Sequence, residues 1–119
     1  MKITIPTSVG ELLDKISILQ IKSLHTDNDY VVKELKSLTE IAKQNEVYDD
    51  YYLIKLLDVN QLLWKIEDNL RVLEKHQDFG DAFIKLARSV YITNDERSSI
   101  KKEVNEKYNS FYSEVKIHK

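Results

Sequence analysis

The chain has 119 residues, two glycines, one proline, no cysteine and a formal net charge of -2. So few glycines and prolines leave little turn chemistry for an all-β fold, and the length suits a single domain over residues 1–119. The absence of cysteine excludes disulfides and thiolate metal sites, and the balanced charge lacks the basic surface of a non-specific nucleic-acid binder. Because no apolar run approaches the roughly 18 residues of a membrane span, we expect a cytoplasmic protein with no membrane or nucleic-acid partner.

Apolar residues recur every three or four positions along most of the chain, which predicts an all-α bundle of about five helices. Residues 1–5 alternate in polarity and are predicted to form a short extended segment. The first helix follows from about Val9 to Leu24. Ser8 is its expected N-cap, and Glu11 completes a capping box three residues later.

Polar residues also bound the second and third helices. The second is predicted to start from a capping turn at residues 26–29 and to stop at Asn45. The third carries a regular apolar stripe from Leu53 to Leu73, and residues 76–80 break it. A stripe this regular favours packing against neighbouring helices at shallow, bundle-like angles.

Two further helices are predicted in the last third of the chain. The fourth covers about Phe83 to Val90, and a turn at residues 93–96 separates it from the fifth. This turn fits a second capping box, in which Asn94 and Asp95 are capping residues. The expected apolar stripe of the fifth helix consists of Ile100, Val104, Tyr108, Phe111 and Val115.

Three sequence segments together carry a resemblance to a known protein family. They read SVGELLDKISILQIK, LWKIEDNLRVLEK and FIKLARSVYITNDERSSIKKEVN. Together they resemble a family of small uncharacterised all-helical bacterial and phage proteins, a domain of unknown function. The resemblance covers most of the chain and leaves out roughly the second helix and its flanks. It implies no activity, but the genes that accompany members of the family suggest a link with surface-polysaccharide biosynthesis.

Positive charge comes mainly from lysine, because only three of the 18 lysines and arginines are arginines, at positions 71, 88 and 97. Guanidinium groups form forked hydrogen bonds to carboxylates and phosphates that ammonium groups cannot form. Arg97 and Lys101 are spaced i,i+4, where like charges repel each other. They also lie near the predicted N-terminus of the fifth helix, where the helix dipole disfavours cations. We therefore expect this pair to have an anionic partner.

Two kinds of anion fit Arg97 and Lys101. Glu67 or Asp68 of the third helix would complete a structural network, whereas a small carboxylate or phosphate ligand would bind at the helix N-terminus. Glu67 is also spaced for an ordinary surface ion pair with Arg71, and Trp64 is also typical of core packing. The candidate ligand-binding residues are Glu67, Asp68, Arg71, Arg88, Tyr91, Asn94, Arg97 and Lys101, with Glu11, Lys15, Lys22 and Trp64 as secondary candidates.

Standard catalytic motifs are missing from the sequence. It has no Gly-rich phosphate loop, no GxSxG and no HExxH. His25, His76 and His118 are scattered, so we expect no metal and no cofactor. Glu103 and Glu106 have the i,i+3 spacing of the metal ligands in helical nucleotide pyrophosphatases, but they lie among lysines on a predicted solvated face.

Two functions therefore stay open. The first is a non-enzymatic accessory protein, monomeric or homodimeric, that recognises a small anionic ligand or a protein partner. The second is a small enzyme that acts on a phosphate- or carboxylate-bearing substrate through the Arg/Lys/Glu cluster. An enzyme should gather Glu67, Asp68 and at least two arginines in one pocket of ligand size. A binding module should show those residues consumed in mutual pairs, with an exposed aromatic or apolar patch elsewhere.

Overall fold

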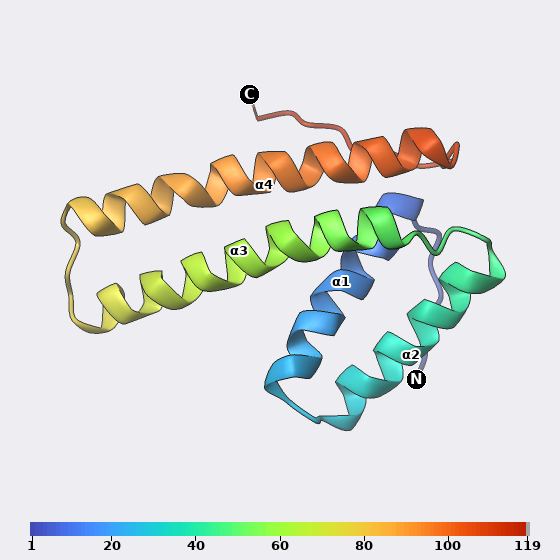
Figure 1. Ribbon diagram of the computed structural model, residues 1–119, viewed down its shortest axis with the longest axis horizontal. Helices are drawn as coiled ribbons and strands as arrows, with labels where there is room; N and C mark the ends of the chain where they lie inside the picture. The colour runs from blue at the N-terminus through green and yellow to red at the C-terminus, as the bar shows by residue number, and fades with distance from the viewer. Residues whose placement is uncertain (119) are drawn as a thin grey trace.

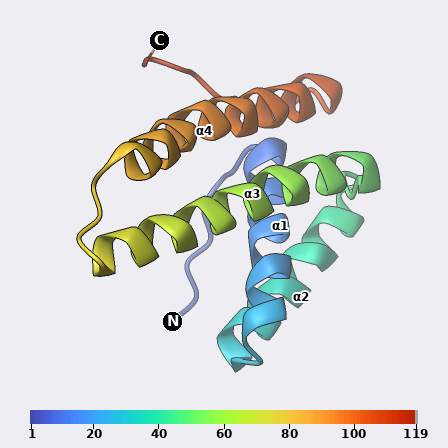
Figure 2. The same cartoon turned by 60° about the vertical axis from the view of Figure 1, so that its left-hand side comes forward.

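The computed structural model describes residues 1–118 and is all-helical, as the sequence predicts. Its four helices are α1 (Val9–His25), α2 (Asp29–Gln44), α3 (Asp50–Lys75) and α4 (Asp81–Lys107), and the described residues contain no strand. Figure 1 shows α3 and α4 side by side as a long antiparallel hairpin, with α1 and α2 below one half of it. Figure 2 shows the N-terminal end of α1 next to both long helices.

The predicted starts of the first two helices are confirmed. The backbone N–H of Glu11 donates to the hydroxyl of Ser8 at 3.0 Å, so Ser8 is the N-cap of α1. Asn28 caps α2 by accepting from the N–H of Tyr30 at 2.9 Å. Asn45 is the C-cap of α2, at the position where the sequence predicts that this helix stops.

Helices α2, α3 and α4 end in the same way, and none of them uses glycine. The residue after each C-cap is in the left-handed region, with φ of 56° at Glu46, 53° at Gln77 and 53° at Asn109. A hydrogen bond from the next residue then reaches back into the last turn, as from the N–H of Val47 to the carbonyl of Ala42 at 2.9 Å. This is the Schellman arrangement, in which glycine is the usual left-handed residue.

The sequence prediction of five helices is wrong by one, because no turn separates the expected fourth and fifth helices. Residues 93–96 lie inside α4, where Thr93 is buried and Asn94 lies against Arg97. Residue types that cap helices can also lie inside a helix when their side chains have partners there. The 27 residues of α4 also contain neither glycine nor proline to break the helix. The expected fourth helix and the first part of the expected fifth are therefore one continuous helix.

The predicted extension of the last helix to Val115 is also wrong. Helix α4 ends at Lys107, and Phe111 and Val115 are 91% and 82% exposed. The chain after the helix turns back along α4 (Figure 1), where an ion pair of 3.1 Å joins Glu114 to Lys101. The left-handed residue at position 109 stops the helix before the apolar positions that seemed to continue its stripe.

Helix α1 is the only helix that contacts all three others among the described residues. Its contacts build the core, in which Leu13, Ile16, Leu56 and Val104 are fully buried. Beyond Ile66 in α3 and before Thr93 in α4 no residue is buried, although these turns are helical. We call residues 67–92, the half of the long hairpin that contains no buried residue, the arm.

Helix α1 approaches the backbone of α4 closely at Gly10. A Cβ atom at this position would lie 2.5 Å from the backbone oxygen of Lys101 and 2.9 Å from the side-chain oxygen of Asn105. The N–H of Gly10 donates to that same side-chain oxygen at 2.6 Å. Only glycine allows the two helices to lie this close together.

We expect Gly10→Ala to lower the free energy of unfolding by about 2 kcal/mol, because α1 must move away from α4 to make room for the methyl group. Urea unfolding followed by circular dichroism measures the change. Gly80→Ala is the matched control, since its Cβ would meet only the Asp78 carboxylate at 3.3 Å. That variant should change stability by less than about 1 kcal/mol. Equal effects of the two substitutions would contradict the role of close approach at Gly10.

Asp49 joins the start of α3 to the end of α4. It caps α3 by accepting from the N–H of Tyr52 at 3.1 Å, and it also accepts from Lys107 at 2.7 Å and from the hydroxyl of Tyr108. Burial alone would raise the pKa of Asp49, but the hydrogen bonds from Lys107, Tyr108 and Tyr52 outweigh burial and lower the pKa.

We expect Asp49→Asn to weaken the acid dependence of stability. The carboxylate has a lower pKa in the folded chain than its unfolded value of about 4, so it contributes stability above that pH. This contribution is lost as the pH falls through the lowered folded-state pKa. Asparagine still accepts from Tyr52 but cannot titrate. Urea unfolding from pH 7 to pH 3 should therefore show a smaller loss below pH 4 than in the parent, whereas the exposed control Asp50→Asn should behave like the parent.

Candidate functional site

A fully buried carboxylate, that of Asp14, lies at the centre of a polar network. Arg97 donates to both carboxylate oxygens, from Nε at 2.9 Å and from a terminal nitrogen at 2.5 Å. The amide of Asn60 donates to Asp14 and to the hydroxyl of Ser17, both at 2.9 Å. These four residues, which we call the Asp14 network, connect α1, α3 and α4.

Lys101 extends this network one turn along α4. Its ammonium group lies 2.7 Å from the carboxylate of Glu11 and 3.1 Å from that of Glu114. Burial would lower the pKa of Lys101, but hydrogen bonds to the two glutamates outweigh burial and raise it. Hydrogen bonds to Asp14 likewise raise the pKa of Arg97. Both cations are therefore held in the charged form by carboxylates of the chain itself.

The expectation that Glu67 or Asp68 of α3 pairs with Arg97 and Lys101 is wrong, because the partners lie on α1 and in the C-terminal segment. The expected dipole penalty is also absent, since both cations lie in the interior of α4 and not at a helix N-terminus. The like-charge repulsion does have the predicted consequence, because an anion from elsewhere in the chain compensates each cation.

Asn94 is the one remaining primary candidate with a hydrogen bond to Arg97 among the described residues. Glu67 and Arg71 form an i,i+4 ion pair of 3.6 Å on the surface of α3. Arg88 and Tyr91 are exposed on the arm, and Asn94 accepts from Arg97 at 3.5 Å. The three arginines therefore do not line one pocket.

The secondary candidates on α1 also have separate places. The carboxylate of Glu11 forms an ion pair with Lys101, as described above. Lys15 forms an exposed ion pair of 3.0 Å with Glu34 of α2. Lys22 is exposed in the last turn of α1. These two lysines lie on the surface of α1, outside the Asp14 network.

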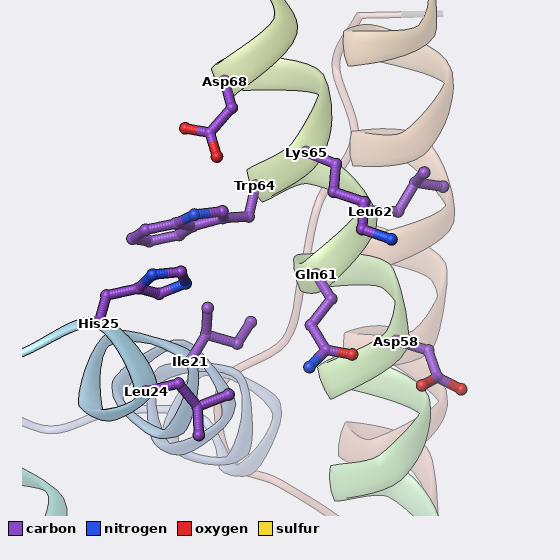
Figure 3. A pocket seen from close by; sticks show the side chains of 9 residues that line it. All are labelled: Ile21, Leu24, His25, Asp58, Gln61, Leu62, Trp64, Lys65 and Asp68. Atoms are coloured by element: carbon purple, nitrogen blue, oxygen red, sulfur yellow. The ribbon is translucent and has the colours of Figure 1, made fainter.

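A surface groove of about 530 Å³ lies between the last turns of α1 and the middle of α3 (Figure 3). Its volume lies within the range of ligand pockets. The rings of Trp64 and His25 stack in the groove, with centroids 4.6 Å apart and planes inclined by 12°. The lining residues, which define the α1–α3 groove, are Ile21, Leu24, His25, Asp58, Gln61, Leu62, Trp64, Lys65 and Asp68.

Within the part of the chain that the structure describes, the charged groups of the groove are the carboxylates of Asp58 and Asp68 and the ammonium group of Lys65. Figure 3 shows the carboxylate of Asp68 on the side of the Trp64 ring opposite His25, and the side chain of Lys65 directed away from that ring toward Leu62. The C-terminal end of α1, which carries the negative pole of the helix dipole, lies at His25. Neither Glu67 nor an arginine lines the groove.

Sequence reasoning did not name Asp14, Ser17 or Asn60 as site residues, so Arg97 was the one predicted member of the Asp14 network. A signal for Asp14 and Ser17 was present, because Gly10, Asp14, Ser17 and Ile21 follow one another at helical spacing and lie on the buried stripe of α1. A carboxylate on a buried stripe is rarely left without a cationic partner. This pattern, combined with the scarcity of arginine, would have indicated the pair of Asp14 and Arg97.

The fold and the network define a small all-helical protein in which a buried ion pair fixes a long helical hairpin to the first helix. The chain belongs to DUF6165, a family of unknown function whose model matches residues 1–119. The family resemblance inferred from three segments is thus confirmed as membership of a family of unknown function, and the match includes the second helix. No curated protein and no solved structure matches the chain. None of the helices among the described residues is long and apolar enough to cross a membrane.

We expect Asp14→Asn to lower the free energy of unfolding by about 3 kcal/mol, because it leaves Arg97 without a carboxylate in a mostly buried position. This is the lower end of the range for a broken buried pair, since the Arg97 side chain is still 27% exposed. Glu67→Gln is the control, because it breaks an exposed pair worth only a few tenths of a kcal/mol. Urea unfolding at pH 7 measures both, and equal losses would contradict the structural role of Asp14.

Proposed function

We propose that the protein is a non-enzymatic accessory module that recognises a protein partner through the α1–α3 groove. The observation that supports this most is the pairing of Arg97 and Lys101 with carboxylates of the chain. A cation whose donors already point at carboxylates has few left for a phosphate or carboxylate ligand. This pairing favours the protein partner over the small anionic ligand.

The composition of the groove supports the same choice. Its aliphatic side chains and stacked aromatic pair provide surface whose burial is favourable on binding, and its few polar groups can orient a ligand. Tryptophan is enriched among the residues that carry most of the binding energy in protein interfaces. A module of this kind needs the Asp14 network as a rigid support and not as a reactive group.

The enzymatic alternative has less support. It requires Glu67, Asp68 and at least two arginines around one substrate, and among these residues only Asp68 lines the groove. The proposed pathway, surface-polysaccharide biosynthesis, rests on the family resemblance alone.

A thermal-shift panel tests the proposed function. We expect phosphate, citrate, nucleotides and nucleotide sugars to raise the melting temperature no more than sodium chloride of the same ionic strength. A specific ligand at 100 times its Kd would stabilise the fold by about 2.7 kcal/mol, a shift of several degrees in a domain of this size. A saturable shift by one of these anions, with amide NMR shifts centred on residues 97–101, would overturn the assignment.

A further inference from the structure

We propose that the α1–α3 groove binds the guanidinium group of an arginine side chain, carried by a segment of the partner protein, between Trp64 and Asp68. This inference rests on the proposed function and adds the chemistry of the partner. The proposed ligand group is positively charged, whereas the small ligand expected from the sequence is an anion.

The geometry around Trp64 leaves one ring face for a ligand. His25 stacks on the other face at 4.6 Å, which holds the indole in place. Asp68 follows Trp64 at i,i+4, and Figure 3 shows its carboxylate on the side of the ring opposite His25. A planar guanidinium can stack on the indole and donate a forked pair of hydrogen bonds to that carboxylate. An ammonium group offers neither the planar stack nor the fork.

The electrostatics of the groove favour a cation. Two carboxylates line it, and the negative pole of α1 lies at His25. Lys65 is the one lysine that lines the groove among residues 1–118, and its side chain is directed away from Trp64 and Asp68 (Figure 3). An anion placed on the open face of Trp64 would meet Asp68 and would be repelled.

The apolar part of the groove suits the rest of an arginine side chain. Ile21, Leu24 and Leu62 provide aliphatic surface against which the methylene groups can pack, as they do where long cationic side chains lie along apolar surface. Binding thus combines an apolar stem contact with a charged head contact.

The position of Asp58 favours a chain segment over a free small molecule. Asp58 and Asp68 are separated by about 15 Å along the axis of α3, given a rise of 1.5 Å per residue. One guanidinium group cannot reach both carboxylates. An extended segment advances about 3.3 Å per residue, so two arginines four or five positions apart can reach both ends of the groove.

Fluorescence titration tests this inference, because Trp64 is the only tryptophan of the chain. The probes are acetyl-arginine amide, an unstructured peptide with two arginines four positions apart, and the same peptide with citrulline in place of arginine. We expect a saturable change in Trp64 emission with both arginine probes, at least tenfold tighter binding of the peptide, and no response to citrulline, which keeps the shape but lacks the charge. The proposal is overturned if no arginine probe changes the Trp64 emission, or if the citrulline peptide changes it as much as the arginine peptide does.

Three variants assign the binding to the groove and separate the two sources of guanidinium. We expect Asp68→Asn to weaken both arginine probes at least tenfold, and Asp58→Asn to weaken only the peptide. Glu106→Gln removes one exposed carboxylate outside the groove and should change neither. If both arginine probes bind with equal affinity and Asp58→Asn has no effect, the ligand is a free guanidinium compound and not a segment of a partner protein. Unchanged binding to the Asp68→Asn variant would exclude the groove.

The two tests fail in different ways. If neither the arginine probes nor the anions bind, the proposed guanidinium chemistry of the ligand is wrong, but the proposed protein-binding function is not contradicted. If an anion binds at Arg97 and Lys101, the assignment of a protein-binding module is itself wrong. Circular dichroism of each variant verifies the fold, which these substitutions of exposed side chains should leave intact.

Discussion

The structure depends on how one buried carboxylate is neutralised. Asp14 lies in α1, the only helix that touches all the others among the described residues, and its side chain is out of contact with water. Such a group is tolerated only when a cation and hydrogen bonds compensate the lost hydration. Arg97 supplies the cation from α4 and Asn60 supplies a further donor from α3. Because these bonds are directional, they define the register of three helices, which apolar packing alone fixes less strictly.

The contacts between α1 and α4 form an ordered series along both helices. Gly10 faces Asn105, Glu11 binds Lys101, and Asp14 binds Arg97. Positions rise along α1 as they fall along α4, so the two helices cross in opposite directions along a polar seam. A shift of α1 by one turn would break all three contacts together and would leave Asp14 without its partner. Fixing this register is a more plausible role for the buried charges than a large net stabilisation, because desolvation offsets much of the attraction.

Much of the fold could be predicted from the sequence, because helical periodicity and capping residues are local signals. They gave α1 with its cap at Ser8, α2 with its stop at Asn45, and the long stripe of α3. The turn expected at residues 93–96 was wrong because residues that cap helices can also lie inside one, as Thr93 does when its side chain is buried.

The candidate site was less predictable, because it depends on which helices meet. Local spacing showed that Arg97 and Lys101 needed anions but could not show that α1 supplies them. The forked hydrogen bonds expected of arginine occur at Arg97, whereas Arg71 lies in an ordinary surface pair. The groove was also missed, since its lining comes from the end of α1 and one side of α3. Only Trp64 and Asp68 of that lining were among the candidates.

The arm has a consequence for how the molecule can open. Residues 67–92 contain no buried side chain. The tertiary contacts of these helical turns are therefore mainly those between α3 and α4. Regions with few buried contacts open locally at a lower free energy than the core. The α1–α3 groove lies at the base of this arm, where Trp64 of α3 meets His25 of α1. A segment bound there, as proposed, would contact both α1 and the arm, so its binding would disfavour this local opening of the arm.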